Sequence, residues 1–249
     1  MTSYQKLCTE FYDIDKPNAP EDALAFYLRY VADVNGPILE PMCGSGRFLI
    51  PLLERGFDID GVDASPHMLQ ACRNNCIKRG ITPVLYEQSI ERITLSKQYG
   101  LVIIPASSFC LVIEQKDVEE SLRRIYALLT PAAKFVVEVE LHRQRPSESR
   151  PWEGRWVERS DGTKIVLSTL SHYDAKDHLI NSINRYDLVK NWQLLETEFE
   201  DFNLRYYDLT EFDRLLEAAG FQNRKALKPY TFSATDETDR SVVFECSKH

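Results

Sequence analysis

The sequence predicts an α/β fold: a doubly wound, mostly parallel sheet with helices on both faces, interrupted by an antiparallel β insertion. Short apolar segments alternate with amphipathic ones from residue 38 to residue 141, which is typical of parallel strands joined by crossover helices. Between residues 155 and 207 this spacing gives way to strand-like runs separated by turns at 160–163 and 174–177. Helical spacing then returns, so the insertion lies within the parallel core.

Local signals place the elements of the first half. Residues 20–34 carry Leu24, Leu28 and Val31 at helical spacing after an acidic first turn, which predicts a helix. Ser65 is a good N-cap and Pro66 suits the first helical position, so a second helix should run to about residue 79. The other expected elements are strands at 38–40, 58–63, 83–86 and 101–104, and a helix at 47–54.

The second half is expected to begin with a helix at Asp117, because Glu120 completes the spacing of a capping box. Residues 135–141 predict a fifth strand, and a polar, proline-rich connection leads from there into the insertion. A helix at 210–219 should end at Gly220, since glycine readily adopts the left-handed conformation that closes helices. Residues 241–246 predict the last strand.

Composition restricts the function classes. The formal net charge of -8 disfavours nucleic-acid binding, which needs clustered lysine and arginine. No apolar run is long enough to span a bilayer, and the N-terminus lacks the apolar core of a signal peptide, so we expect a cytoplasmic protein without a membrane partner. Among the six cysteines, Cys72 and Cys76 share a helical face without further ligands at metal spacing. We therefore expect free thiols and no metal site.

The glycine turn after the first strand allows three interpretations. A phosphate-binding loop of the Walker type needs Gly-Lys-Ser/Thr, but Gly46 is followed by Arg47 and Phe48. A dinucleotide fingerprint needs a third glycine for close helix packing, and Leu49 stands in that place. The third interpretation is a turn that binds the adenosyl group of S-adenosylmethionine.

Four segments stand out: "EPMCGSGRF" from Glu40, "GVDASPHMLQACRNN" with Asp63 at the end of the second strand, "LLTPAAKFVVEV" with the fifth strand and the turn before it, and "LTEFDRLLEAAGFQ" near the C-terminus. Together they resemble the class I S-adenosylmethionine-dependent methyltransferases. The likeness covers residues 36–141 and 208–249. It implies a Rossmann-like sheet and S-adenosyl-L-methionine as the cofactor.

The resemblance also implies roles for individual residues. Asp63 would accept hydrogen bonds from both ribose hydroxyls, and Glu40 would hold the amino group of the cofactor directly or through water. Gly44 and Gly46 would let the backbone approach the cofactor. The full set of expected cofactor contacts is Glu40, Met42, Cys43, Gly44, Gly46, Asp63, Ala64, Met68, Ser89, Ile90 and Pro105.

The sequence departs from the family pattern at several positions. Met42 stands where the family usually has its first glycine, and Ser89 where many members have an acid facing the adenine amine. Ala132 and Ala133 replace a Gly-Gly turn, and Gly100 replaces a common aspartate before the fourth strand. These changes leave room for weakened cofactor binding.

The sequence contains fewer signals for the residues that would contact the methyl acceptor. The loop after the fourth strand, residues 105–109, lacks the Asn/Asp-Pro-Pro-Tyr/Phe motif of enzymes that methylate exocyclic or amide nitrogens, which argues against adenine or glutamine acceptors. Tyr12 and His142 are candidate catalytic residues, although a base is needed only if the nucleophile arrives protonated. Candidate substrate contacts are Tyr12, Ser107, Arg205 and Tyr206.

We therefore predict a methyltransferase that moves a methyl group to an O, N or C nucleophile of a small molecule by in-line displacement, as a monomer or homodimer. One alternative is a cofactor- or partner-binding protein without catalysis, and a nicotinamide-dependent oxidoreductase is disfavoured by the missing third glycine. The predicted units are an N-terminal helical segment over the site (1–35), the cofactor-binding core (36–145 and 208–249) and a β insertion that caps the substrate (146–207).

Overall fold

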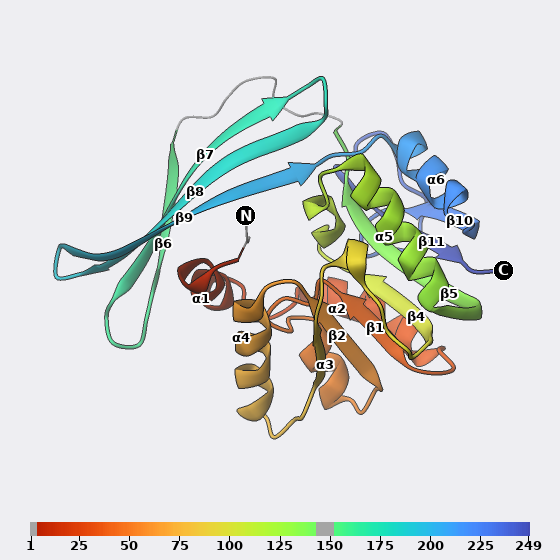
Figure 1. Ribbon diagram of the computed structural model, residues 1–249, viewed down its shortest axis with the longest axis horizontal. Helices are drawn as coiled ribbons and strands as arrows, with labels where there is room; N and C mark the ends of the chain where they lie inside the picture. Colours follow the sequence, from red (N-terminus) through yellow and green to blue (C-terminus); the bar gives the residue numbers. More distant parts are fainter. Residues whose placement is uncertain (1–3, 143–151) are drawn as a thin grey trace.

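The computed structural model describes residues 4–142 and 152–249. A seven-stranded mixed sheet forms the core, and a separate four-stranded antiparallel sheet extends from it (Figure 1). This arrangement confirms the predicted fold class. The core strands are β1 (Ile38–Pro41), β2 (Ile59–Asp63), β3 (Val84–Glu87), β4 (Tyr99–Ile104), β5 (Leu129–Glu140), β10 (Gln222–Leu227) and β11 (Ser241–Ser247).

The core sheet is doubly wound, with strand order β10-β11-β5-β4-β1-β2-β3. Strands β3, β2, β1, β4 and β5 are parallel, whereas β11 runs antiparallel to β5 and β10 antiparallel to β11. The chain order reverses between β1 and β4. In sheets of this kind, ligands bind beyond the carboxyl ends of the strands at such a switch point. Strand β10 was not expected from the sequence.

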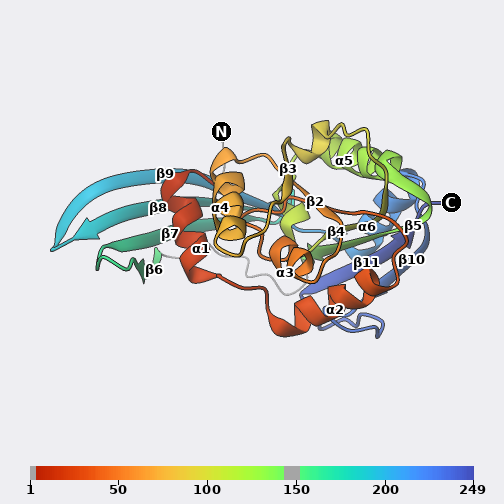
Figure 2. The same cartoon turned by 90° about the horizontal axis from the view of Figure 1, so that it is seen from below.

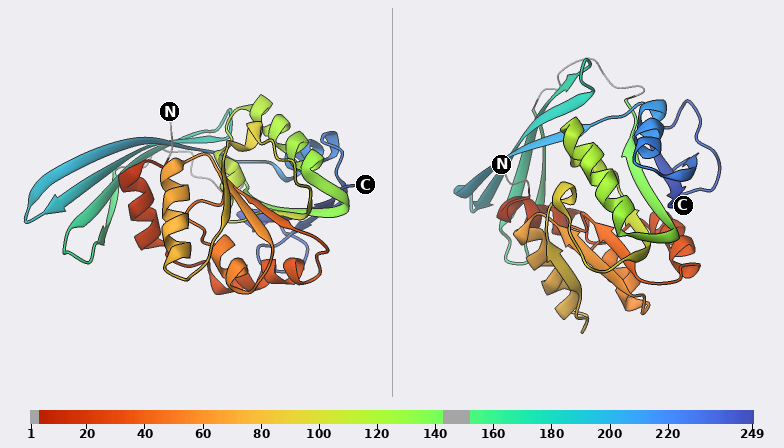
Figure 3. Two further views of the ribbon diagram at one scale, coloured as in Figure 1. Left: turned by 60° about the horizontal axis from the view of Figure 1, so that its bottom comes forward. Right: turned by 45° about the vertical axis from the view of Figure 1, so that its right-hand side comes forward.

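Helices cover both faces of the core sheet, as Figure 3 shows. Helices α5 (Gln115–Leu128) and α6 (Leu209–Ala218) pack on one face, where Leu122, Ile125 and Phe212 belong to the larger apolar cluster. Helices α2 (Glu21–Ala32) and α3 (Leu49–Glu54) pack on the other. The short 3-10 helices η1 (Ile90–Arg92) and η2 (Ser108–Leu111) follow β3 and β4.

The insertion is an antiparallel sheet of β6 (Glu153–Glu158), β7 (Lys164–Asp174), β8 (Leu179–Lys190) and β9 (Gln193–Arg205). Helix α1 (Lys6–Asp15) lies between this sheet and α4 (Pro66–Ile77), as Figure 2 shows. Leu7 and Phe11 of α1 share an apolar cluster with Ile165 and Tyr186 of the insertion. The N-terminal segment thus joins the two sheets.

The structure corrects one local prediction in α5. The capping box at Asp117 and Glu120 was wrong: α5 begins at Gln115, and the Glu120 carboxylate instead binds Arg123 and Arg124 at 2.6 Å. Ion pairs with arginines three and four residues on compete for the carboxylate that the box would need. The predicted boundary at 145/146 lies outside the described residues.

Candidate functional site

The glycine turn leaves β1 in a left-handed backbone conformation. Gly44 and Gly46 have φ values of 55° and 90°, and Met42 reaches 61° although it is not glycine. A Cβ on Gly46 would lie 2.7 Å from Sγ of Cys72, so any larger residue would push α4 away from the turn. The turn therefore needs glycine at position 46 for space as well as for backbone freedom.

Asp63 closes β2 and faces the turn. Its two carboxylate oxygens accept hydrogen bonds of 2.8 Å from the amides of Gly44 and Ser65. Burial raises the pKa of Asp63, and these backbone donors act in the opposite direction. Each oxygen keeps further acceptor capacity, which matches the two hydroxyls of a ribose.

Glu40 is the most unusual group of the turn. It is buried at the end of β1, and its Oε2 has no hydrogen-bond partner among the described residues. Burial, and then the charge of Asp63, raise the pKa of Glu40 well above its ordinary value. A buried carboxylate without a partner is costly, and a bound cation would relieve that cost. The amino group of S-adenosylmethionine has the required charge, so Glu40 and the turn fit this cofactor.

The expected adenine contacts lie on α4 and η1. Met68 is buried, and its Sδ comes within 3.8 Å of the position that a Cβ on Gly44 would occupy. Ser89 precedes η1 and donates a hydrogen bond of 2.6 Å to Glu91 Oε1. Position 89 therefore lies beside an acidic side chain, that of Glu91, although it is not acidic itself.

The remaining expected cofactor contacts differ in exposure. Ile90 is buried and packs in the larger apolar cluster. Cys43 is buried, and its Sγ lies 2.8 Å from the position that a Cβ on Gly61 would occupy, so the side chain packs against β2. Ala64 is exposed beside Asp63, and Pro105 is buried after β4.

The carboxyl ends of β4 and β5 carry a buried acid that the sequence did not single out. Glu138 accepts hydrogen bonds from the Ala106 amide at 3.0 Å and the Tyr230 hydroxyl at 3.1 Å. Ser107 lies within 3.4 Å of Glu138 and donates to Glu140 at 3.2 Å. Burial raises the pKa of Glu138 to about 7. Ala106 and Ser107 both have a φ of 55°, a strained conformation of the kind found at functional sites.

Tyr27 of α2 lies next to this acid on the same face of the sheet as Glu40. Its hydroxyl is buried without a hydrogen-bond partner in the described part of the chain. Burial raises the pKa of Tyr27, and the charges of Glu138 and Glu40 add to that effect. The hydroxyl thus lies within the electrostatic influence of both acids.

The N-terminal segment is tied to the glycine turn through Arg47. The guanidinium donates to the Tyr12 hydroxyl at 3.3 Å and to the Asn18 carbonyl at 3.0 Å. Tyr12 is half-buried and packs edge-on against Tyr4, with ring centroids 6.1 Å apart. These contacts place Tyr12 beside the residue that follows Gly46.

Arg205, Tyr206 and His142 lie where the insertion rejoins the core. The Arg205 guanidinium donates to the Ile113 carbonyl at 3.1 Å and to Gln115 Oε1 at 2.7 Å. The His142 ring stacks on His178 with centroids 4.1 Å apart. Tyr206 is buried. The contacts of Arg205 and His142 show how these two side chains hold the junction. A role of any of the three residues toward the substrate stays a prediction.

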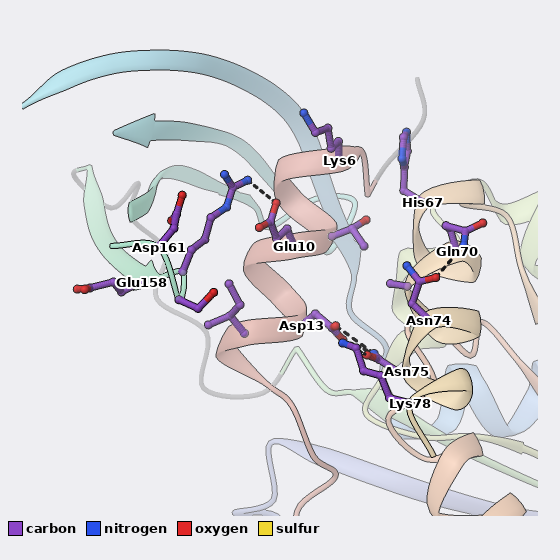
Figure 4. Close-up of a pocket in the computed structure, with 15 residues that line it drawn as sticks. Lys6, Glu10, Asp13, His67, Gln70, Asn74, Asn75, Lys78, Glu158 and Asp161 are labelled. Carbon is purple, nitrogen blue, oxygen red and sulfur yellow. Dashed lines mark hydrogen bonds and ion pairs between the residues drawn. The ribbon is translucent and has the colours of Figure 1, made fainter. Parts of the chain in front are cut away.

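Two surface clefts lie near the site. A cleft of about 700 Å³ separates α1 from α4 and the β6–β7 turn, and Glu10, Asp13 and Lys78 project into it (Figure 4). The residues expected to bind the cofactor do not line it. A smaller cleft of about 320 Å³ contains Gly46 and Arg47.

The described residues show neither a metal cluster nor a membrane-spanning helix. Within residues 4–142 and 152–249, no three His, Cys, Asp or Glu side chains gather in a group able to hold a metal ion. No helix in the same two ranges has both the length and the apolar character needed to cross a membrane.

The glycine turn, Asp63 and Glu40 thus lie together beside the switch point of a doubly wound α/β sheet. Residues 38–132 match the family model of the methyltransferase domain. A putative methyltransferase of Bacillus subtilis is 22% identical over 239 residues, which cover 95% of this chain and 94% of that protein. Both matches support the predicted resemblance to the class I S-adenosylmethionine-dependent methyltransferases.

Solved structures show the same fold over nearly the whole chain. An S-adenosylmethionine-dependent methyltransferase from Clostridium acetobutylicum has a TM-score of 0.78 at 12% identity and covers 99% of both chains. A sugar N-methyltransferase from Streptoalloteichus has a TM-score of 0.76 at 17% identity, covering 100% of this chain and 97% of that one. The comparisons give no support to the non-catalytic alternative.

Proposed function

We propose that the protein methylates a small molecule held at the carboxyl edge of the core sheet, beneath the N-terminal segment and the β insertion. The observation that carries the cofactor assignment is the buried Glu40 oxygen without a partner beside the glycine turn. The likeness to a sugar N-methyltransferase extends through the insertion and supports a small acceptor. The net charge of -8 counts against a nucleic acid. The six free, buried cysteines support a cytoplasmic location.

Each part of the cofactor has a proposed partner. Asp63 receives the ribose hydroxyls, Glu40 the amino group, and Met68 one face of the adenine. Ser89, with its hydroxyl donating to Glu91, keeps a lone pair for the adenine amine. The other proposed contacts are Met42, Cys43, Gly44, Gly46, Ala64, Ile90 and Pro105.

The bound cofactor supplies a methyl group already activated on a sulfonium, so the chain mainly orients the acceptor and excludes water. Tyr12 and Arg47 would close the N-terminal segment over the turn. Ser107 would border the acceptor, and Arg205 and Tyr206 would contact it from the insertion. His142 remains a candidate proton acceptor.

Calorimetric titration with S-adenosylmethionine and S-adenosylhomocysteine tests this function. Both should bind, and Asp63→Ala should weaken both by about 1–3 kcal/mol, because a charge-assisted contact is lost. Asp58→Ala is the matched control: Asp58 lies just before the start of the same strand, is 68% exposed and pairs with Lys97. If neither ligand binds at millimolar concentration, the proposed function is wrong.

A further inference from the structure

We propose that Glu138 is a catalytic residue: its carboxylate binds the cationic amine of the methyl acceptor and takes up the proton that the amine must lose before transfer. The inference rests on the proposed function and deepens it, because it makes the acceptor a small molecule with a basic nitrogen.

The position of Glu138 is the first support. Val137 pairs with Ile104, so Glu138 lies level with the loop that follows β4, and the Ala106 amide binds it directly. Glu138 alternates with Val137 and Val139, which belong to the apolar cluster of α5 and α6, and therefore points to the face that carries Glu40. It thus lies on the β4–β5 side of the switch point, next to the cofactor cradle.

The hydrogen-bond pattern is the second support. A carboxylate that merely anchored the strained loop would need the Ala106 amide and the Ser107 hydroxyl alone. Glu138 also accepts from the Tyr230 hydroxyl, brought to the site from the loop before β11, and from the Ser241 hydroxyl of β11 at 3.5 Å. The nearby Tyr27 hydroxyl is buried and has no partner in the described ranges.

The charges around Glu138 favour a cation. Burial is the main cause of its raised pKa, and Glu140 on the same strand raises it further, while the hydrogen bonds from Tyr230, Ala106 and Ser107 lower it. The adjacent hydroxyls of Tyr27 and Tyr230 are neutral, because their own pKa values are raised. The charged groups that act on Tyr230 from further away are Asp22 and Arg47.

The chemistry restricts the acceptor. An aliphatic ammonium has a pKa of about 10, so a carboxylate with a pKa of about 7 can accept its proton. The pKa of an alcohol is far higher. The ammonium proton moves to a Glu138 oxygen and leaves a lone pair on nitrogen. That lone pair forms the N–C bond while the C–S bond breaks and its electrons remain on sulfur. Glu138 then loses the proton to solvent.

Sinefungin tests the inference without an acceptor. This analogue of S-adenosylmethionine carries a protonated amine at the position of the transferred methyl, whereas S-adenosylhomocysteine has no charge there. We expect the affinity for sinefungin relative to S-adenosylhomocysteine to rise about tenfold from pH 6 to pH 8. A group with a pKa of about 7 goes from roughly one-tenth to nine-tenths ionised over that range.

Two variants test whether Glu138 causes the pH dependence of the affinity ratio. Glu138→Gln should make the ratio independent of pH. Glu245→Gln is the matched control, because Glu245 also binds a tyrosine hydroxyl, at 2.8 Å, but lies two register positions further from the carboxyl edge. It should keep the tenfold rise.

The outcomes separate the two proposals. Failure of S-adenosylhomocysteine to bind the wild-type protein overturns the proposed function itself. The role of Glu138 is overturned by either of two results obtained while S-adenosylhomocysteine binds normally. One is a sinefungin-to-S-adenosylhomocysteine affinity ratio that does not change with pH, and the other is a ratio that rises with pH in Glu138→Gln as it does in the wild type. If Glu138→Gln does not fold, Tyr230→Phe is the deciding variant. Loss of the Tyr230 hydrogen bond should move the midpoint of the pH dependence of the affinity ratio to higher pH, because that bond lowers the pKa of Glu138. A midpoint that does not move contradicts the proposal.

Discussion

At the scale of single residues, Met42 shows why the family usually has glycine in its place. Its φ of 61° costs a non-glycine residue about 1 kcal/mol, which packing against the larger apolar cluster offsets. Met42→Val should therefore destabilise the protein by about 1–2 kcal/mol more than Met42→Gly, since a β-branched side chain tolerates this backbone least. Urea unfolding of both variants measures the difference, and equal stabilities would show that the strain is unimportant.

Glu138 should make stability depend on pH. Its folded pKa of about 7 lies above the ordinary 4.5, so its contribution is fully present below pH 4.5 and is lost as pH rises through about 7. The unfolding free energy of the wild type, relative to Glu138→Gln, should fall by about 2 kcal/mol between pH 5 and pH 8. Urea titrations at both pH values test this. A difference that stays constant would mean that Glu138 titrates normally.

The residues predicted from sequence and those missed differ in how far apart they lie along the chain. Glu40, Gly44 and Asp63 belong to one strand-turn-helix-strand unit, so a local motif identifies them. The cluster of Glu138, Tyr27 and Tyr230 draws on segments that only the folded sheet brings together. Because no local spacing links them, the sequence could not predict their contact.

At the scale of elements, α1 begins without a capping bond from its own neighbouring residue. Gln5 makes no such bond among the described residues, and instead Glu198 of β9 accepts from the amides of Leu7 at 3.0 Å and Cys8 at 2.9 Å. A carboxylate at a helix N-terminus satisfies free amides and complements the helix dipole. The insertion therefore holds the N-terminal helix in place, which a search for local caps could not reveal.

Glu198→Ala should destabilise α1 by about 1–2 kcal/mol, the usual loss for a helix cap. Hydrogen exchange of residues 6–15 should become faster while β1 and β4 stay protected. Glu196→Ala is the control on the same strand, because its ion pair with Lys6 joins side chains that are 42% and 61% exposed and contributes little. Equal effects of the two variants would refute the capping role.

At the scale of the whole molecule, the insertion can act as the proposed cap only if the two sheets keep a fixed relation. The sequence predicted both sheets from their periodicities, but not what connects them. Arg205 provides part of this connection, because from the end of β9 it binds the Ile113 carbonyl, Gln115 and Glu211, which belong to the core. Its guanidinium therefore contacts three separate positions of the core.

Arg205→Ala should uncouple the sheets without unfolding the core. The loss of three hydrogen bonds, one of them to a carboxylate, should reduce the local stability of the insertion by about 2 kcal/mol and speed its exchange roughly 30-fold. Hydrogen exchange with mass spectrometry should show faster exchange in β7–β9 and unchanged exchange in β1, β4 and β5. Arg185→Ala is the control, because the Arg185 guanidinium binds Asp187 on its own strand. Equal acceleration in both sheets would mean that Arg205 supports global stability and is not a specific link between them.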